Sequence, residues 1–275
     1  MRLAALVLIV ATSVLAAEPS TSRPPARIAD APGDSSADLA KKLSNPVSDL
    51  TIVPLQNDFD FGGGPRDDGF RYTLKIQPVI PISLSEPWNL ISRTIIPFID
   101  QSDMIGRTEQ SGLGDTLQSL FLSPKAPTRG NWFWGAGPVF LLPTATDNLL
   151  GAEKFGLGPT AVLLRQTHGW TYGALVNHLW SVAGDGNRDD LSATYLQPVL
   201  DYTTKRHTTF GLGAESTYDW KQRQWTVPVL VNLSQLVMLG KLPIELKLSG
   251  KYYAEAPEGA PEWGLRFTIT FLFPK

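Results

Sequence analysis

Cysteine is absent from this chain of 275 residues, and charged residues are scarce at 18%, below the roughly 25% of an ordinary soluble domain. Without cysteine, the chain has no disulfide scaffold, thiolate zinc site, cysteine nucleophile or lipidated N-terminal cysteine. The formal charge of −2 lacks the basic balance of a nucleic-acid binder, so no nucleic-acid partner is expected. Glycine (24 residues) and proline (22 residues) are abundant instead, which disfavours a helical bundle or a coiled coil.

The first residues have the pattern of a secretory signal peptide. Arg2 gives a basic start, residues 3–15 form an apolar run, and Ala16 and Ala17 are small residues suited to cleavage. We therefore predict a signal peptide over 1–16 and an exported protein. The alternative is a buried N-terminal helix or a membrane anchor, for which the apolar run is short.

Residues 17–47 are predicted to form a flexible periplasmic arm. Their first part, 17–36, is rich in Pro, Ser, Ala and Asp and shows no apolar periodicity, so it buries too little surface to offset its ordering entropy. A short helix is expected over 38–43, ended by Asn45-Pro46. The alternative is that this helix plugs the lumen of a barrel formed by the rest of the chain.

From residue 48 onward the chain divides into strand-like segments in which apolar and polar residues alternate. Near the C-terminus, for example, Phe267 and Ile269 alternate with Arg266 and Thr268. Successive side chains of a strand point to opposite faces, so such a segment has one apolar and one polar face. The twelve segments are 48–60, 69–82, 88–100, 113–123, 132–143, 155–166, 170–182, 191–203, 208–220, 224–235, 243–254 and 262–273.

Segment length and connection length favour a membrane barrel over a soluble sandwich. The segments run to roughly ten to fourteen residues, whereas the strands of soluble sandwiches average about five to six. The connections are mostly shorter on one side than on the other, as in outer-membrane barrels, which also have an even number of strands. We predict an all-β fold: a transmembrane, antiparallel, up-and-down β-barrel of about twelve strands over 48–275, in the outer membrane of a Gram-negative bacterium.

None of the eight tryptophans lies at the middle of a predicted strand. Four fall at each rim of the predicted barrel, where indole rings prefer the level of the lipid headgroups. In the alternative, a soluble core, some would sit at strand centres. We predict two aromatic girdles in contact with outer-membrane lipid, formed by Trp88, Trp132, Trp134 and Trp170 at one rim and by Trp180, Trp220, Trp225 and Trp263 at the other.

Prolines interrupt several of the predicted strands. Proline lacks the N–H that a strand ladder uses, and a closed barrel has no edge to hold it, so we expect bulges or local breaks in the wall. The alternation of faces also slips in 88–100 and 191–203, where we assign no faces. The prolines inside predicted strands are Pro54, Pro78, Pro97, Pro138, Pro159, Pro198 and Pro228.

The last strand resembles the C-terminal signal by which the barrel insertion machinery recognises its substrates. Its pattern is Glu262-x-Gly264-x-x-Phe267-x-Ile269, although two residues follow the last aromatic residue, Phe273. We therefore expect that machinery as a partner of the chain.

Six runs of the chain together resemble an outer-membrane β-barrel family associated with the meta-pathway of phenol degradation, whose members are often labelled "transporter" or "neuromedin U". The resemblance extends over roughly 43–275. It implies an outer-membrane barrel that passes small molecules, including aromatic or hydrophobic ones, and it brings no catalytic residues. The runs are 43–61, 71–84, 88–101, 111–125, 135–146 and 215–220.

The polar faces of the predicted strands carry charges that would line a lumen. Because the first and last strands of a closed barrel are neighbours, we expect a basic wall with acidic residues beside or facing it. Rings of charge set selectivity in pores, so we assign these residues to selectivity. The alternative is that the charges pair across strands and fill a narrow lumen without conducting. The basic residues are Arg71, Lys75, Lys247, Lys251 and Arg266, and the acidic residues are Glu215, Asp219 and Glu245.

These patterns predict a channel or transporter for the passive passage of small-molecule solutes, not an enzyme. The alternatives are a non-conducting structural barrel and a barrel-borne lipid hydrolase, which needs a lipid-facing nucleophile beside a base. His178 lies on an apolar face, but Leu179 and Trp180 follow it, so the His-x-Ser pair of outer-membrane phospholipases is absent. No catalytic residue, cofactor or metal is predicted, since the acidic run 185–190 lacks the glycine and glutamate of a calcium loop.

Overall fold

The computed structural model describes residues 39, 42–43, 45 and 47–274, and the predicted signal peptide over 1–16 lies outside them. In the described residues, sixteen strands form one sheet, and no helix is long and apolar enough to cross a membrane. The strands are β1 (Thr51–Gly63), β2 (Gly69–Ile76), β3 (Val79–Ser83), β4 (Trp88–Ser102), β5 (Glu109–Leu113), β6 (Thr116–Pro124), β7 (Trp132–Leu142), β8 (Lys154–Thr167), β9 (Trp170–Gly184), β10 (Ser192–Thr203), β11 (Thr208–Ala214), β12 (Ser216–Asp219), β13 (Gln224–Thr226), β14 (Pro228–Leu239), β15 (Leu242–Tyr253) and β16 (Trp263–Phe273).

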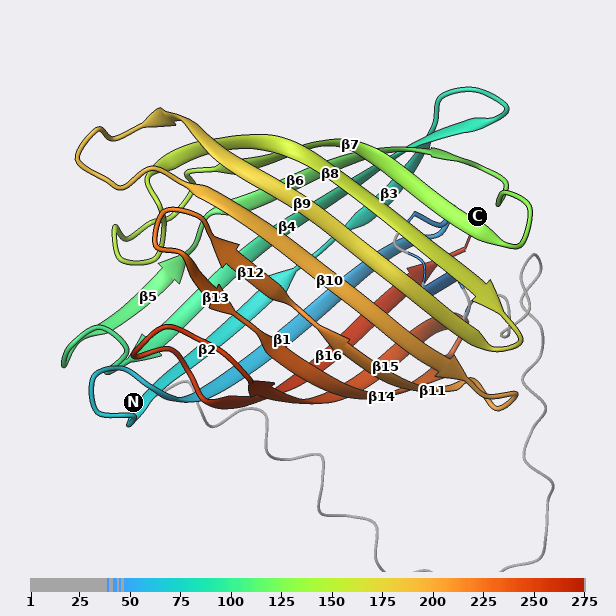
Figure 1. Ribbon diagram of the computed structural model, residues 1–275. Helices are drawn as coiled ribbons and strands as arrows, with labels where there is room; N and C mark the ends of the chain where they lie inside the picture. Colours follow the sequence, from blue (N-terminus) through green and yellow to red (C-terminus); the bar gives the residue numbers. More distant parts are fainter. Residues whose placement is uncertain (1–38, 40–41, 44, 46, 275) are drawn as a thin grey trace, which may run out of the picture.

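The sheet closes on itself, because β1 pairs with β2 on one side and with β16, the last strand, on the other. Four strands of the wall are each interrupted by a short break, so each is divided into two consecutive strands. The divided strands are β2/β3, β5/β6, β11/β12 and β13/β14. The wall therefore has twelve antiparallel strands, which confirms the predicted all-β, up-and-down barrel. In Figure 1 the strands cross the molecule obliquely between its two ends, as the strand tilt of a barrel requires.

The connections differ between the two ends of the barrel. The short-turn end, where β1 begins and β16 ends, has the connections 84–87, 125–131, 168–169, 204–207 and 240–241. The long-loop end has the connections 64–68, 103–108, 143–153, 185–191, 220–223 and 254–262. In Figure 1 the C-terminus marks the short-turn end.

Breaks in the wall lie beside prolines, which cannot donate to the ladder. Pro78 separates β2 from β3, and Pro228 opens β14 after the break that follows β13. At Glu215, between β11 and β12, the backbone N–H donates to the carbonyl of Pro228 at 3.0 Å. The wall is broken at some prolines only, since Pro138 and Pro159, which oppose each other in β7 and β8, lie within unbroken strands.

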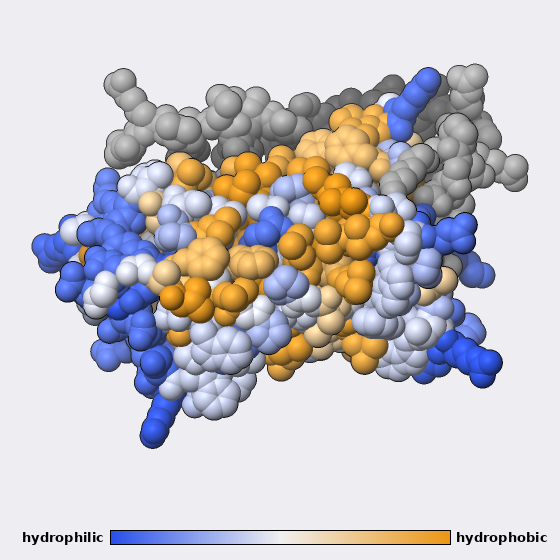
Figure 2. Space-filling view, turned by 90° about the horizontal axis from the view of Figure 1, so that it is seen from above, coloured by the Kyte–Doolittle hydropathy of each residue, from blue (hydrophilic) through white to orange (hydrophobic). Residues whose placement is uncertain are grey.

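Strands present an apolar face outward and a largely polar face inward. In β16, Leu265 and Phe267 point outward and are 46% and 37% exposed, whereas Arg266 and Thr268 point inward and are each 6% exposed. Figure 2 shows apolar residues in orange across the middle of the visible face and hydrophilic residues in blue at both ends. An apolar band between two polar rims is the outer surface of a membrane barrel.

At the short-turn end the inner face is apolar, and it packs against the described residues of 39–50, which we call the N-terminal segment. In Figure 1 the described part of this segment is drawn in blue near the C-terminus. Leu39, Val47 and Leu50 of this segment are 2%, 5% and 2% exposed. Leu39 and Leu43 lie in a helical turn, within the range predicted as a short helix. The inner-face members of the cluster are Ile52, Val79, Ile91, Phe121, Val162, Leu164, Leu175, Leu236 and Leu272, with Phe133, Tyr195 and Val199 packed against them.

The wall is shaped to receive this segment. A Cβ atom on Gly135, in β7, would lie 3.0 Å from Cγ1 of Val47 and 3.2 Å from Cβ of Phe121, closer than ordinary packing allows. The glycine therefore makes room for Val47. The predicted arm over 17–47 is described only near its end, and that end lies inside the barrel.

Candidate functional site

Asp58 is the centre of an ion-pair network inside the barrel. Its side chain projects inward from β1, and the residue is 1% exposed. Nζ of Lys75 lies 3.1 Å from Oδ2 of Asp58, and Nζ of Lys251 and Nε of Arg266 lie 3.2 and 2.6 Å from Oδ1. Lys251 also contacts Asp60, with 2.6 Å between Nζ and Oδ1. The network joins β2, β1, β16 and β15, so it pairs buried charges across the closure of the barrel.

Arg266 connects this network to a strand that is not its neighbour. Its Nη1 and Nη2 atoms donate to Oε1 and Oε2 of Glu215 at 2.6 and 2.8 Å. Glu215 lies in the break between β11 and β12, and β14 and β15 stand between that break and β16 in the wall. The pair therefore crosses part of the lumen instead of following the wall, and it reduces the open cross-section there.

Other predicted lumen residues have different surroundings. Arg71 donates from Nε to Gln101 of β4 at 2.7 Å. Nζ of Lys247 lies 3.6 Å from Oε2 of Glu245, and the Lys247 side chain is 36% exposed. Asp219 accepts two backbone N–H groups of the turn that follows it, at 2.8 and 3.0 Å, so it stabilises a connection at the long-loop end.

Carboxylates alternate with the cations of the predicted basic wall, so this face of the lumen does not carry one sign of charge. Sequence reasoning missed Asp58 and Asp60, which bring negative charge between the lysines and Arg266. Their signal was present in β1, where they alternate with the apolar residues Phe59 and Phe61.

Two cavities adjoin the network. One of about 320 Å³ lies against β1, β2, β4, β6, β9, β10 and β12. The other, of about 200 Å³, extends from the network to Leu43 of the N-terminal segment. Both are lined by Gln56, Gln77, Gln197 and Glu215, so the two cavities share these side chains as a common border.

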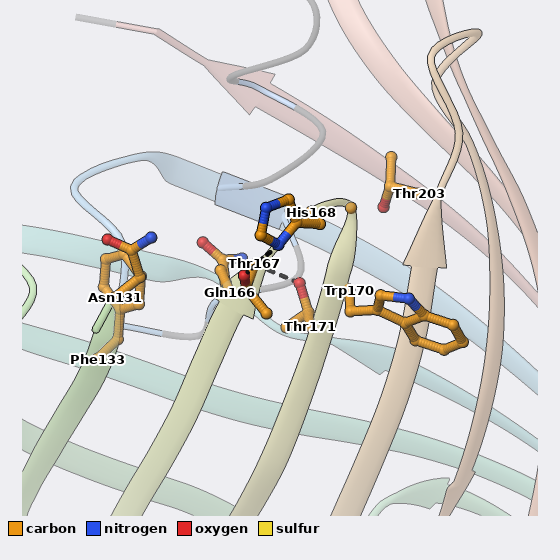
Figure 3. Close-up of a pocket in the computed structure, with 9 residues that line it drawn as sticks. Asn131, Phe133, Gln166, Thr167, His168, Trp170, Thr171 and Thr203 are labelled. Carbon is orange, nitrogen blue, oxygen red and sulfur yellow. Dashed lines mark hydrogen bonds between the residues drawn. The ribbon is translucent and has the colours of Figure 1, made fainter.

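A third cavity, of about 350 Å³, lies at the short-turn end around the hairpin between β8 and β9 (Figure 3). This hairpin, His168-Gly169, has both residues at positive φ (49° and 86°), as two-residue turns of the primed types require. The cavity combines the aromatic rings of Phe133 and Trp170 with polar side chains. Figure 3 shows the hydrogen bond from Gln166 to Thr171, with 3.2 Å between Nε2 and Oγ1.

The eight tryptophans all project from the outer face, near the ends of the strands. At the short-turn end, the rings of Trp88 and Trp134 meet edge to face with centroids 5.9 Å apart. At the long-loop end, Trp263 stacks on Phe61 with centroids 4.6 Å apart. The positions at that end are Trp180, Trp220, Trp225 and Trp263, and those at the short-turn end are Trp88, Trp132, Trp134 and Trp170.

A hydroxyl and an imidazole meet on the outer face. Oγ1 of Thr194, in β10, lies 2.7 Å from Nδ1 of His178, in β9. Nε1 of Trp220 donates to the same Thr194 oxygen at 2.9 Å. The other ring nitrogen of His178, Nε2, is buried without a hydrogen-bond partner among the described residues, so no such group orients the imidazole.

At the long-loop end, ion pairs join the loop 185–191 to the start of β8 and to the loop 143–153. Lys154 lies 3.2 Å from Asp190, and this hydrogen bond lowers the pKa of the Asp190 carboxyl. Arg188 pairs with Glu153 at 3.3 Å and donates to two carbonyls of the loop 143–153. Within the described part of the chain, no group of three or more His, Cys, Asp or Glu side chains is placed to hold a metal ion.

No protein-family model and no curated protein matches this sequence. Among solved structures, an outer membrane channel from Pseudomonas putida F1 superimposes with a TM-score of 0.65 at 15% identity, covering 82% of this chain and 96% of that chain. The NanC porin superimposes with a TM-score of 0.51 at 11% identity, covering 80% and 98%. This chain has the fold of an outer-membrane barrel. At these identities the likeness is one of fold, so the function is argued from the lumen.

Proposed function

We propose that this protein is an outer-membrane channel through which small solutes pass passively. The observation that carries the proposal is the interior of the barrel, which holds paired charges, glutamine side chains and two cavities of about 320 and 200 Å³. A polar interior is typical of barrels that conduct water and solutes. The resemblance to the phenol-degradation family supports small aromatic or hydrophobic molecules as cargo.

The aromatic belts and the turn lengths give the proposed channel its orientation. Outer-membrane barrels have short periplasmic turns and longer outer loops, so the short-turn end faces the periplasm. The two belts of tryptophan then lie at the two headgroup levels, in contact with outer-membrane lipid. The pattern of β16, from Glu262 to Phe273, supports recognition by the barrel insertion machinery.

In the proposed channel, the N-terminal segment is a plug at the periplasmic mouth. Leu39, Val47 and Leu50 are buried in a cluster formed by inner-face residues of β1, β3, β4, β6, β8, β9, β14 and β16. The cluster involves strands from all around the wall, so the segment occupies the lumen at this level. Conduction therefore requires the segment to leave or to shift.

The lipid-hydrolase alternative has one observation in its favour, the contact between Thr194 and His178 on the outer face. Two observations oppose it. The indole of Trp220 donates to the same hydroxyl oxygen, and the second nitrogen of His178 has no partner among the described residues to orient it. A nucleophile and a base need such an orienting group, so we favour the channel.

Reconstitution of the refolded full chain separates the channel from a structural barrel. Planar bilayers report single-channel current, and swelling of proteoliposomes reports the entry of uncharged small solutes. We expect discrete conductance steps and solute-dependent swelling. A folded, membrane-inserted protein that gives neither signal, even when Leu39→Asp and Leu43→Asp release the plug, would be a structural barrel.

A further inference from the structure

The larger lumen cavity has one cationic side and one apolar side. Arg93 projects into it from β4, and Ile95, Leu117 and Leu179 line it from β4, β6 and β9. These three apolar side chains are half-buried although they point inward, so part of their surface faces the cavity and not another side chain. A volume of about 320 Å³ lies within the range of small-molecule sites.

Arg93 differs from the other cations around this cavity in its partners. Lys75, Lys251 and Arg266 are neutralised by three carboxylates, those of Asp58, Asp60 and Glu215. These three positive and three negative charges cancel. The net charge of the six side chains and Arg93 together is therefore the single positive charge of Arg93.

Among the described residues, Arg93 has no ion pair. Its Nη2 atom donates to the neutral amide oxygen of Gln77 at 3.2 Å. Gln77 is held in turn by its own hydrogen bond to Gln56, at 3.1 Å, and Gln56 donates to Asp58 at 2.8 Å. Since a guanidinium carries five N–H donors, most of the donors of Arg93 have no acceptor among the residues that the structure describes.

The carboxylate of Glu215 lines the same cavity, but it does not repel an anion strongly. Both of its oxygens accept hydrogen bonds from Arg266, so its charge is already compensated. An incoming anion therefore meets the uncompensated Arg93 and a neutralised Glu215.

We propose that this cavity binds a small amphipathic carboxylate, with the carboxylate on the guanidinium of Arg93 and the apolar body against Ile95, Leu117 and Leu179. Arginine binds carboxylates through two parallel hydrogen bonds, which fixes the orientation of the solute. The phenol ring of Tyr195, which also lines the cavity, adds an aromatic surface for an apolar body. This inference rests on the proposed channel function and names the class of solute that the channel selects.

Two probes of similar size test the site: 3-phenylpropanoate, which carries the carboxylate, and 3-phenylpropan-1-ol, which does not. Binding of each probe to the refolded full chain in detergent is measured by isothermal titration calorimetry. We expect the anion to bind at least about tenfold more tightly than the alcohol, because a charge-assisted hydrogen bond is worth about that factor. Equal affinity for the two probes, or binding of neither, would overturn the proposal.

Three variants then assign the two sides of the cavity. Arg93→Gln removes the preference for the anion and leaves the affinity for the alcohol unchanged, whereas Leu117→Gln weakens the binding of both probes. Arg165→Gln is the matched control, since this arginine lies on the ring of Trp132 at the outer face, 5.7 Å from its centroid. A preference that survives Arg93→Gln, or that Arg165→Gln also removes, contradicts the assignment.

The carboxylate site and the channel function are tested separately. If Arg93→Gln does not refold, the comparison of the two probes on the unchanged protein and the Leu117→Gln variant still decide the matter. Conductance in KCl, measured on the same samples, reports the channel and needs no organic anion. Conductance without probe binding overturns only the carboxylate site. Probe binding with no conductance, in both the full chain and a variant whose plug is released by Leu39→Asp and Leu43→Asp, overturns only the channel.

Discussion

The guanidinium of Arg266 holds both carboxylate oxygens of Glu215, at 2.6 and 2.8 Å, although two strands of the wall separate the residues. Glu215 reaches this position because the strand is interrupted there, between β11 and β12, with its N–H on the carbonyl of Pro228. The break in the wall and the ion pair that crosses the lumen are therefore parts of one arrangement.

Removing either partner of this pair should both destabilise the barrel and change its ion selectivity. Arg266→Gln leaves the Glu215 carboxylate unpaired, and breaking a buried pair in this way costs roughly 3–5 kcal/mol. Because a positive charge is lost, the reversal potential in a KCl gradient should shift toward cation selectivity. Unfolding by urea in detergent micelles measures the stability.

Glu215→Gln is the matched variant and should shift the reversal potential in the opposite direction, toward anions. The double variant Arg266→Gln with Glu215→Gln should recover part of the lost stability, since no unpaired charge of this pair then remains. Shifts of the same sign in the two single variants would show that the pair does not lie on the ion path.

Lys247 and Lys251 should respond differently to charge reversal, although both face inward from β15. The Lys247 side chain is 36% exposed and borders a cavity, so Lys247→Glu should shift selectivity toward cations and leave folding intact. The Lys251 side chain is 4% exposed and pairs with Asp58 and Asp60, so Lys251→Glu places three carboxylates together and should prevent folding. Heat-modifiable migration on gels reports folding.

Leu246→Arg tests the assignment of faces in the same strand. Leu246 lies between Glu245 and Lys247 and points outward, where a charge near the middle of the bilayer costs about 2–4 kcal/mol. Insertion should be impaired, in contrast to Lys247→Glu. If Leu246→Arg inserts normally and alters selectivity, the assignment of the inward and outward faces of β15 is reversed.

The contact between Thr194 and His178 should be structural. We expect no hydrolysis of phospholipid in detergent micelles above that of a heat-denatured sample, with or without divalent cations. Thr194→Val should leave single-channel conductance unchanged, because Thr194 points to the outer face. A hydrolytic activity that Thr194→Val and His178→Ala both remove would establish the enzyme instead.

Periodicity predicted the strands well where one face meets water and the other meets lipid. In β16, Arg266 and Thr268 lie inward and Phe267 outward, and this alternation is visible in the sequence. In β4 and β10 it slips, because Ile91 belongs to the apolar cluster around the N-terminal segment and Tyr195 packs against that cluster, and both face inward. Where the inner face is apolar as well as the outer face, apolar and polar residues no longer alternate along the strand.

The candidate site was less accessible to sequence reasoning. The cations of the lumen follow from the alternation, but their partners depend on which strands the closed wall brings together. Asp58 meets Lys251 and Arg266 only because β1 pairs with β16 and β16 with β15. The pair of Arg266 with Glu215 depends on a break in the wall, and local sequence does not reveal which side chain such a break directs across the lumen.

Single-channel conductance of a variant with Leu39→Asp and Leu43→Asp shows whether the N-terminal segment plugs the lumen. Each aspartate places a charge within or against the apolar cluster, where Leu39 is 2% exposed, so the segment should leave the lumen. A deletion of 17–37 is the control, and it should fold and conduct like the full chain. We expect a several-fold rise in conductance for the double variant, with unchanged heat-modifiable migration. A folded double variant that conducts no more than the full chain would contradict it.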